Sequence, residues 1–314
     1  MSTEFANGAS NGARTFKLAA AQVDGEPAVV LLLDSGVYRL RDLLPAGSPV
    51  PDRLDALFVD WARWHPILVR SVAQVSGRAT AIEPERWLVP VRPSKLICVG
   101  VNYHDHLREM GTPRAPEFPY SFFKPVSTGL VPSGGAVSLP VGPKMVDWEA
   151  ELAVVIGAPL HRGRGPAVLD AVAGYTVYND LSARDWIATT REPGIDWVMM
   201  KAYDGFSPIG PLVTPKEFVR DPQDLPIRCW VNGELKQDSN TAEMIFGVAA
   251  ILEHLSGIMT LEPGDVIATG TPAGVGFGAV PQQFLKAGDT VTVEITGLGR
   301  LETLIVKPSQ GAPA

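Results

Sequence analysis

Short apolar runs separated by turn residues dominate the first part of the chain. An apolar run at 28–33, a turn at 34–36 and a second short run at 37–40 predict a pair of β-strands. From residue 53 to about residue 77, recurring apolar residues predict helix, and Pro66 predicts an interruption because proline has no backbone N–H to donate. This part of the chain therefore combines short strands with helical segments.

Changes in composition divide the chain into three parts. Residues 1–14 are rich in Ser, Asn, Gly and Ala, which is typical of a disordered tail. Pro84, Pro90 and Pro93 then cluster before the next apolar run and predict a linker. We therefore expect a small N-terminal domain at 15–92 and a larger domain at 93–307.

The larger domain alternates strand-like runs with turns. One helix is expected at 242–256, where apolar residues recur three and four apart, and Gly257 predicts its end. Because few helices separate the strands, a mixed, mostly antiparallel sheet fits better than βαβ units. The predicted fold class is mainly β with α (α+β). Its strand-like runs lie at 96–101, 150–157, 171–178, 227–231, 265–269 and 290–296.

Composition and charge exclude several classes of protein. Apolar residues make up 46% and charged residues 19% of the 314 residues, as in ordinary globular proteins. The net charge of −7 argues against a nucleic-acid partner, since neutralising phosphates requires clustered Lys and Arg. A small anionic substrate remains compatible with it, because a few local cations can outweigh the overall charge.

The cysteines and the apolar segments predict the compartment. Cys98 and Cys229 lie far apart without a C-x-x-C, so we expect both to be reduced and buried. No apolar segment of signal-peptide length opens the chain, and runs such as 28–33 are too short to span a bilayer. We therefore expect a cytoplasmic protein without membrane contact.

An acidic motif begins the strand-like run at 150–157. On a strand, Asp147, Glu149 and Glu151 would all point to one face, where like charges repel one another. Either this face is a solvated rim, or a cation lies among the carboxylates. Carboxylates without a companion thiolate favour Mg²⁺ or Mn²⁺, with Ca²⁺ as a further candidate, over zinc.

A further acid follows the run at 171–178. Asp180 is either the N-cap of the next segment or the carboxylate that joins Glu149 and Glu151 in one site. The second alternative completes a site made of carboxylates alone.

The segment 102–109 reads N-Y-H-D-H-L-R-E. If a helical turn starts there, His106 and Glu109 lie three residues apart on one face, where the carboxylate can orient the imidazole as a general base. The alternatives are an incidental pair on a surface helix, or a zinc site formed with His104, for which no third nitrogen or sulfur ligand is evident.

These motifs, taken in order, resemble the fumarylacetoacetate hydrolase family. The resemblance rests on N-Y-x-x-H-x-x-E (102–109), D-W-E-x-E-L (147–152) and Y-N-D-L-S-A-R-D (178–185), then Lys201 before S-P-I-G-P (207–211) and T-G-T-P-x-G-V-G (269–276). It spans about residues 95–300 and implies a mixed β-sandwich or roll with a small N-terminal domain. It makes 93–307 a catalytic domain and implies a homodimer.

The resemblance also implies roles for single residues. Glu149, Glu151 and Asp180 match the metal ligands of the family, and His106 and Glu109 match the dyad that activates water in its hydrolases. Asp147 matches no role. The other residues with implied roles are Lys201, which matches a catalytic cation, and Tyr103, Phe123, Arg184 and Thr271, which match substrate contacts. The proline-rich segment 110–124 is expected to fold over the site as a lid.

We expect a metal-dependent hydrolase that cleaves a C–C bond in a 1,3-diketo or acylpyruvate-type acid. Such a cleavage passes through an enolate whose negative charge the metal would stabilise. Stabilisation of the same enolate also supports decarboxylation of an oxaloacetate-like acid, or isomerisation of a 2-hydroxyhepta-2,4-diene-1,7-dioate-type diacid. The alternative of another class is a non-catalytic, metal-stabilised binding protein, which would need neither the dyad nor Lys201. No Gly-rich nucleotide motif or G-x-S-x-G nucleophile elbow is present.

Overall fold

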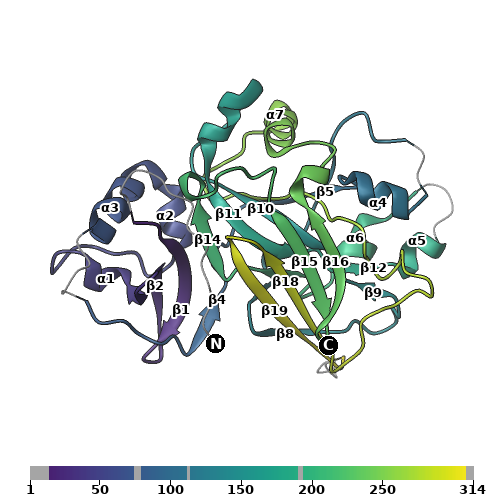
Figure 1. Cartoon of the computed structure of the whole chain (residues 1–314), viewed down its shortest axis with the longest axis horizontal. Helices are drawn as coiled ribbons and strands as arrows, with labels where there is room; N and C mark the ends of the chain where they lie inside the picture. The colour runs from purple at the N-terminus through teal and green to yellow at the C-terminus, as the bar shows by residue number, and fades with distance from the viewer. Residues whose placement is uncertain (1–13, 74–78, 112–113, 190–193, 309–314) are drawn as a thin grey trace.

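Strands dominate the computed structural model, which describes residues 14–73, 79–111, 114–189 and 194–308 (Figure 1). The predicted strands are present with ends shifted by a few residues at most. The strands are β1 (Lys17–Val23), β2 (Glu26–Leu33), β3 (Gly36–Arg39), β4 (Arg86–Leu88), β5 (Leu96–Gly100), β6 (Tyr120–Phe123), β7 (Leu130–Pro132), β8 (Gly135–Ser138), β9 (Val146–Asp147), β10 (Ala150–Ile156), β11 (Val172–Asn179), β12 (Ser182–Ala183), β13 (Ser207–Ile209), β14 (Leu212–Pro215), β15 (Pro226–Val231), β16 (Glu234–Asn240), β17 (Val266–Ala268), β18 (Thr290–Ile295) and β19 (Gly299–Val306).

Helices are short and lie at the periphery of the sheets (Figure 1). The α-helices are α1 (Leu40–Leu43), α2 (Asp55–Val59), α3 (Trp61–Ala73), α4 (His104–Glu109), α5 (Asp185–Thr189), α6 (Trp197–Lys201) and α7 (Val248–Ile258), and short 3₁₀ helices are η1 (Gly165–Ala171), η2 (Lys216–Phe218) and η3 (Thr241–Glu243). No helix among the described residues is long and apolar enough to cross a membrane.

The strands form a central sheet of 12 strands, a second sheet of 5 strands and a small sheet of 2 strands, β12 and β9. The path through the central sheet is β3-β2-β1-β14-β11-β10-β17-β5-β6, and the second sheet has the order β16-β15-β18-β19-β8. Most pairs are antiparallel, and β17–β5, β13–β7 and β19–β8 are parallel. This confirms the mainly β, mixed α+β fold class.

Alternation along β10 builds a core on each face of the central sheet. Leu152, Val154 and Ile156 join the core shared with β15, β18, β19 and α7. Ala153 and Val155 point the other way and join the core shared with β1, α2 and α3. A strand buried on both faces explains why 150–156 reads as a continuous apolar run after its acidic start.

The N-terminal segment adds strands to the central sheet. β1 pairs with β14, with Leu18 opposite Val213 and Ala19 opposite Leu212, so the sheet continues across the predicted linker. The division into domains at 15–92 and 93–307 stays a prediction. The tail predicted at 1–14 and the helix end at 74–77 lie almost wholly outside the described residues.

Two helix predictions are corrected by the structure. Pro66 lies inside α3, and the break falls at Asp60, between α2 and α3. The helix expected at 242–256 begins only at Val248 and continues through Gly257 to Ile258. The physical reason lies at its start: Asn102 accepts backbone N–H groups of Ile245 (2.8 Å, to its carbonyl) and Phe246 (2.9 Å, to Oδ1), which holds this stretch out of helix.

Candidate metal and proton-transfer site

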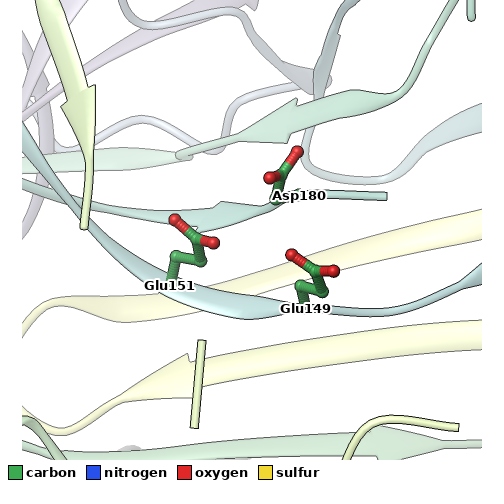
Figure 2. A group of neighbouring side chains, drawn as sticks. All are labelled: Glu149, Glu151 and Asp180. Atoms are coloured by element: carbon green, nitrogen blue, oxygen red, sulfur yellow. The ribbon is translucent and has the colours of Figure 1, made fainter. Parts of the chain in front are cut away.

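Three carboxylates that are distant in the sequence meet at one end of the central sheet. Glu149 directly precedes β10 and Glu151 lies within it, so strand alternation turns both side chains to the same face. Asp180 follows β11, which pairs with β10 with Ala150 opposite Asn179. The ligand oxygens lie within 4.8 Å of one another, all three residues are buried, and Figure 2 shows their carboxyl groups close together. Asp180 caps no helix, since β12 follows it.

Three buried cations surround these carboxylates. Lys201 Nζ donates to Glu149 Oε2 (2.7 Å) and to Asp180 Oδ2 (2.6 Å). An Arg184 guanidinium nitrogen lies 2.5 Å from Glu149 Oε1, and Lys124 Nζ lies 2.5 Å from Asp180 Oδ1. Burial by itself raises the pKa of Glu149, but Lys201 and Arg184 outweigh it and lower the pKa to about 2.

Glu151 differs from its neighbours because it has no ion pair among the described residues. Among the described residues, its hydrogen-bond partner is the backbone N–H of Gly270, at 2.9 Å. Burial, followed by the charges of Asp180 and Glu149, raises the pKa of Glu151 well above its usual range. The three cations equal the three carboxylates in number, but all of them pair with Glu149 or Asp180, and none pairs with Glu151. A divalent ion, which prefers oxygen ligands, would give Glu151 a cation partner, and Glu149, Glu151 and Asp180 would hold it.

The predicted dyad is assembled on α4. His106 Nδ1 lies 3.0 Å from Glu109 Oε2, three residues along the helix, and the imidazole is buried. The ring lies within electrostatic reach of the Glu149 carboxylate. Since Glu109 accepts the proton of Nδ1, Nε2 is the nitrogen left to exchange a proton.

A glycine-rich loop after β17 holds Glu109 from the other side. The backbone N–H of Gly274 donates to Glu109 Oε1 at 2.9 Å, and the carbonyl of Gly274 accepts from the Trp148 indole at 3.0 Å. A side-chain carbon at Gly278 would lie 2.3 Å from Cδ of Glu109. The close contact explains a glycine at 278, and it fixes the orientation of the carboxylate that orients His106.

Asp147, for which the sequence suggested no role, connects this loop with Arg184. It is fully buried. Asp147 Oδ1 accepts from the backbone N–H of Gly276 (2.7 Å), and Oδ2 accepts from that of Phe277 (3.0 Å) and from Arg184 Nε (3.0 Å). Asp147 lies outside the group of clustered ligands. It therefore positions its neighbours rather than completing the metal site.

The residues predicted to contact substrate have different surroundings. Tyr103 is fully buried, and its hydroxyl has no hydrogen-bond partner among the described residues. Thr271 is buried, and its Oγ1 accepts from Gln237 Nε2 at 2.8 Å. Phe123 is 56% exposed. Its neighbour Phe122 faces the site, with Lys201 Nζ 5.3 Å from the ring centroid. Substrate contacts at these positions stay predictions.

The predicted lid segment 110–124 ends in β6, and its residues 112–113 lie outside the described part. Within it, Phe118 stacks on His254 of α7 with ring centroids 5.8 Å apart. The segment lies beside α4, which carries the dyad, and its closure over the site stays a prediction.

The fold and the site together define a sheet-dominated α+β protein with a buried acidic cluster suited to a divalent cation. The model of the family described as "Fumarylacetoacetate (FAA) hydrolase C-terminal" matches residues 95–306 of this chain. The chain belongs to the fumarylacetoacetate hydrolase family and is an enzyme of that family.

Several relatives and solved structures are similar over most of the chain. Oxaloacetate tautomerase fahd2, mitochondrial, of Xenopus laevis is 44% identical over 220 residues, which are 70% of this chain and 68% of that protein. Fumarylacetoacetate hydrolase of Exiguobacterium antarcticum has a TM-score of 0.79 and 32% identity, covering 93% of this chain and 100% of that one. A 2-hydroxyhepta-2,4-diene-1,7-dioate isomerase of Mycobacterium marinum has a TM-score of 0.69 and 32% identity, covering 94% and 100%.

Three residues of the site were missed from the sequence. Lys124 follows a run of aromatic residues, and nothing local indicates that its amine reaches Asp180 and the carbonyls of Leu181 and Phe206. Asp147 was noticed as part of the acidic motif, but its loop partners lie about 130 residues away. Phe123 was predicted as a substrate contact, whereas its neighbour Phe122 is the residue that faces Lys201.

Proposed function

We propose that this enzyme is a divalent-metal-dependent tautomerase that interconverts the keto and enol forms of a 2-oxo acid of the oxaloacetate type. The observation that carries the proposal is a preassembled His106–Glu109 pair near a buried carboxylate cluster in which Glu151 has no ion pair among the described residues. Moving a proton between carbon and oxygen requires one well-placed base and charge stabilisation beside it. Relatives named oxaloacetate tautomerase support the same choice.

His106 is the group that moves the proton in this proposal. Its Nε2 takes a proton from the carbon next to the 2-oxo group and returns it to the oxygen, or the reverse, so no atom is gained or lost. Glu109 keeps the ring oriented through Nδ1. A bound Mg²⁺ or Mn²⁺ would supply Lewis-acid polarisation of the 2-oxo acid.

Lys201 and Arg184 stabilise negative charge on the substrate. Both are buried cations next to Glu149, and for both burial alone lowers the pKa whereas the carboxylates raise it. They therefore keep their charge at neutral pH. In a site closed to water, such fixed charges act strongly on an enolate oxygen.

Three other reactions share some or all of these groups. Hydrolytic C–C cleavage, the expectation from the sequence, uses the dyad to direct water at a carbonyl. Isomerisation of a dienedioate uses it for proton transfer over a longer conjugated system, and the solved isomerase of Mycobacterium marinum favours this as the second candidate. Decarboxylation of oxaloacetate needs the same charge stabilisation without the base.

The test follows enol oxaloacetate as it is diluted into buffer with the Mg²⁺-loaded enzyme. The expected result is loss of the enol absorbance faster than the spontaneous rate, abolished by a chelator and restored by Mg²⁺ or Mn²⁺. Parallel samples measure carbon dioxide release and the cleavage of an acylpyruvate. Acylpyruvate cleavage without any acceleration of enol loss would contradict the proposal and favour the hydrolase.

A further inference from the structure

Gln237 is fully buried, although it lies on β16, the edge strand of the second sheet (Figure 1). The register of β15 and β16 shifts here: Cys229 lies opposite Gln237, and the next residue of β15, Trp230, lies opposite Leu235. Lys236 is therefore the extra residue of a β-bulge, a feature that redirects side chains. Leu235 is 46% exposed, whereas Gln237, two residues further, is 0% exposed. The bulge thus turns the Gln237 amide into the protein.

The glycine-rich loop after β17 packs directly against this bulge. Gly274 has a positive φ of 98°, and a side-chain carbon there would overlap the Lys236 carbonyl oxygen and lie 2.9 Å from Gln237 Cα. A glycine is therefore required at 274, because it alone combines this backbone conformation with so close an approach. The contact brings the T-G-T-P segment of the loop, 269–272, within reach of the Gln237 side chain.

The Gln237 amide joins this loop to the strand that carries the metal-binding glutamates. Its Oε1 accepts from the backbone N–H of Ala150 at 2.9 Å, and Ala150 stands between the two glutamates of the carboxylate cluster. Its Nε2 donates to the Pro272 carbonyl at 2.9 Å and to Thr271 Oγ1 at 2.8 Å. A backbone N–H can only donate and a carbonyl can only accept, so these two partners fix the orientation of the amide.

This orientation decides what the Thr271 hydroxyl can do. Because Oγ1 accepts a proton from Gln237, the hydroxyl keeps its own proton, and no described residue accepts it. Thr269, two residues earlier, differs, since its Oγ1 donates to the Leu152 carbonyl at 2.9 Å. Of the two hydroxyl groups in the T-G-T-P segment, that of Thr271 therefore has a proton left for a ligand.

The position of Thr271 indicates which ligand this is. The preceding residue, Gly270, donates its backbone N–H to Glu151 at 2.9 Å, so Thr271 lies next to the carboxylate cluster. It is 5% exposed. A hydroxyl proton without an acceptor at this place is suited to an anionic oxygen, because a charge-assisted hydrogen bond is about twice as strong as a neutral one.

We propose that Gln237 is a positioning residue, which makes the Thr271 hydroxyl a hydrogen-bond donor to the carboxylate of the bound 2-oxo acid. The inference rests on the proposed function for the class of substrate. Gln237 acts through Thr271 and does not touch the substrate itself. Because the same amide holds Ala150, it also keeps this donor in register with the strand of the metal-binding glutamates.

The test is a double-mutant cycle of Gln237→Glu and Thr271→Val, with oxalate as the ligand. Calorimetry with the Mg²⁺-loaded enzyme measures the Kd of oxalate, and Mn²⁺ titration checks the metal site. An ionised glutamate still accepts from Ala150 but has no proton to donate, so the Thr271 hydroxyl should turn towards it. Oxalate affinity should then fall about tenfold or more, as for loss of a hydrogen bond to a charged group.

Thr271→Val should weaken oxalate binding to a similar extent, whereas Thr271→Ser, which keeps the hydroxyl, should bind within a few-fold of the wild type. In the Thr271→Val background Gln237→Glu should cost clearly less, because the hydroxyl is already absent. A purely structural role of Gln237 predicts the same loss in both backgrounds, and that additivity would overturn the inference. If Gln237→Glu does not fold, Gln237→Met, which adds no charge, takes its place in the cycle with the same coupling expected.

Gln223→Glu is the matched control. Its Oε1 accepts the backbone N–H of Val248 at 2.7 Å and its Nε2 donates to the Thr241 carbonyl, without contact to Thr271, so the Kd of oxalate should not change. With oxaloacetate as substrate, Gln237→Glu should raise KM more than it lowers kcat, since the carboxylate is held in the ground state and the transition state alike.

The two proposals fail separately in this design, because oxalate binding needs no turnover. Coupling between Gln237 and Thr271 without any oxaloacetate tautomerisation would contradict the proposed function alone. Tautomerisation with additive effects on oxalate binding would contradict the role of Gln237 alone.

Discussion

At the scale of single residues, the lack of an ion pair at Glu151 is the feature that favours a bound cation. Glu149 and Asp180 are each paired with buried lysine or arginine, whereas Glu151 has only the Gly270 N–H. An uncompensated buried carboxylate is costly, which is why its pKa rises through burial and through the neighbouring acids.

Glu151→Gln tests this explanation. The amide keeps the size of the side chain but removes the charge, so Mn²⁺ affinity should fall by about tenfold or more, as expected for loss of a ligand. In the presence of a chelator the variant should unfold at the same temperature as the wild type or higher. Mn²⁺ titration and thermal unfolding provide both readouts, and undiminished Mn²⁺ affinity would remove Glu151 from the metal site.

Asp147 gives a second prediction at this scale. Asp147→Asn removes one of the two carboxylate partners of Arg184, the other being Glu149, and weakens two backbone contacts to the glycine-rich loop. Breaking a buried ion pair costs about 3–5 kcal/mol, so the free energy of unfolding should fall by an amount of that order. The exposed Asp221, which also accepts a backbone N–H, is the control. Urea unfolding compares the two, and equal stabilities would show that the buried network contributes little.

Single residues also show how much of the site could be predicted from the sequence. The Glu149–Glu151 pair and the His106–Glu109 pair were predicted from spacings of two and three residues within one short segment, and the structure brings each pair together. Asp180 joins the carboxylates through the pairing of β11 with β10. Lys124 and Asp147 act through partners more than 50 residues away. Their positions depend on the pairing of whole strands, which no local pattern specifies.

At the scale of elements, the loop after β17 and the short helix α4 act as one unit. Gly274 donates to Glu109, and Gly278 leaves the space that the Glu109 carboxylate occupies. The same coupling explains the shortened helix α7, because Asn102, just before α4, takes the N–H groups of residues 245 and 246. Periodicity alone predicted a longer helix because it contains no information about this tertiary contact.

Gly278→Ala should disturb the dyad without unfolding the chain. Its new methyl group would meet the end of the flexible Glu109 side chain, which can move, rather than backbone. We expect kcat to fall about tenfold to a hundredfold, because His106 loses its orienting partner, with the unfolding temperature nearly unchanged. Gly257→Ala in α7, where nothing lies within 4 Å, is the control. Wild-type kcat in Gly278→Ala would show that the Glu109 position is not important for turnover.

At the scale of the whole molecule, the pattern of the sequence predicted several of the strands but not their order. The strand-like runs correspond to β5, β10, β11, β15, β17 and β18. Their arrangement brings β10 between β11 and β17 and joins β1 to β14, a pairing between residues almost 200 positions apart. Long-range pairing depends on the packing of complete faces, so the continuous sheet across the predicted linker was not foreseen.

The arrangement places the acids, the cations and the dyad at one end of the central sheet, which is the basis of the proposed chemistry. β5 and β17 run parallel and end there, and each is followed by a segment of the site, 102–109 after β5 and 269–278 after β17. The carboxylates enter from β10 and β11. The account therefore depends on His106 acting on a substrate held at this end.

The most direct measurement compares His106→Ala with the wild-type enzyme in oxaloacetate tautomerisation, with Mn²⁺ affinity measured on the same samples. The account predicts that kcat falls by about 10²–10⁴-fold, the usual contribution of a general base, while Mn²⁺ affinity stays within a few-fold of wild type. A His106→Ala variant that tautomerises oxaloacetate at nearly the wild-type rate would contradict it.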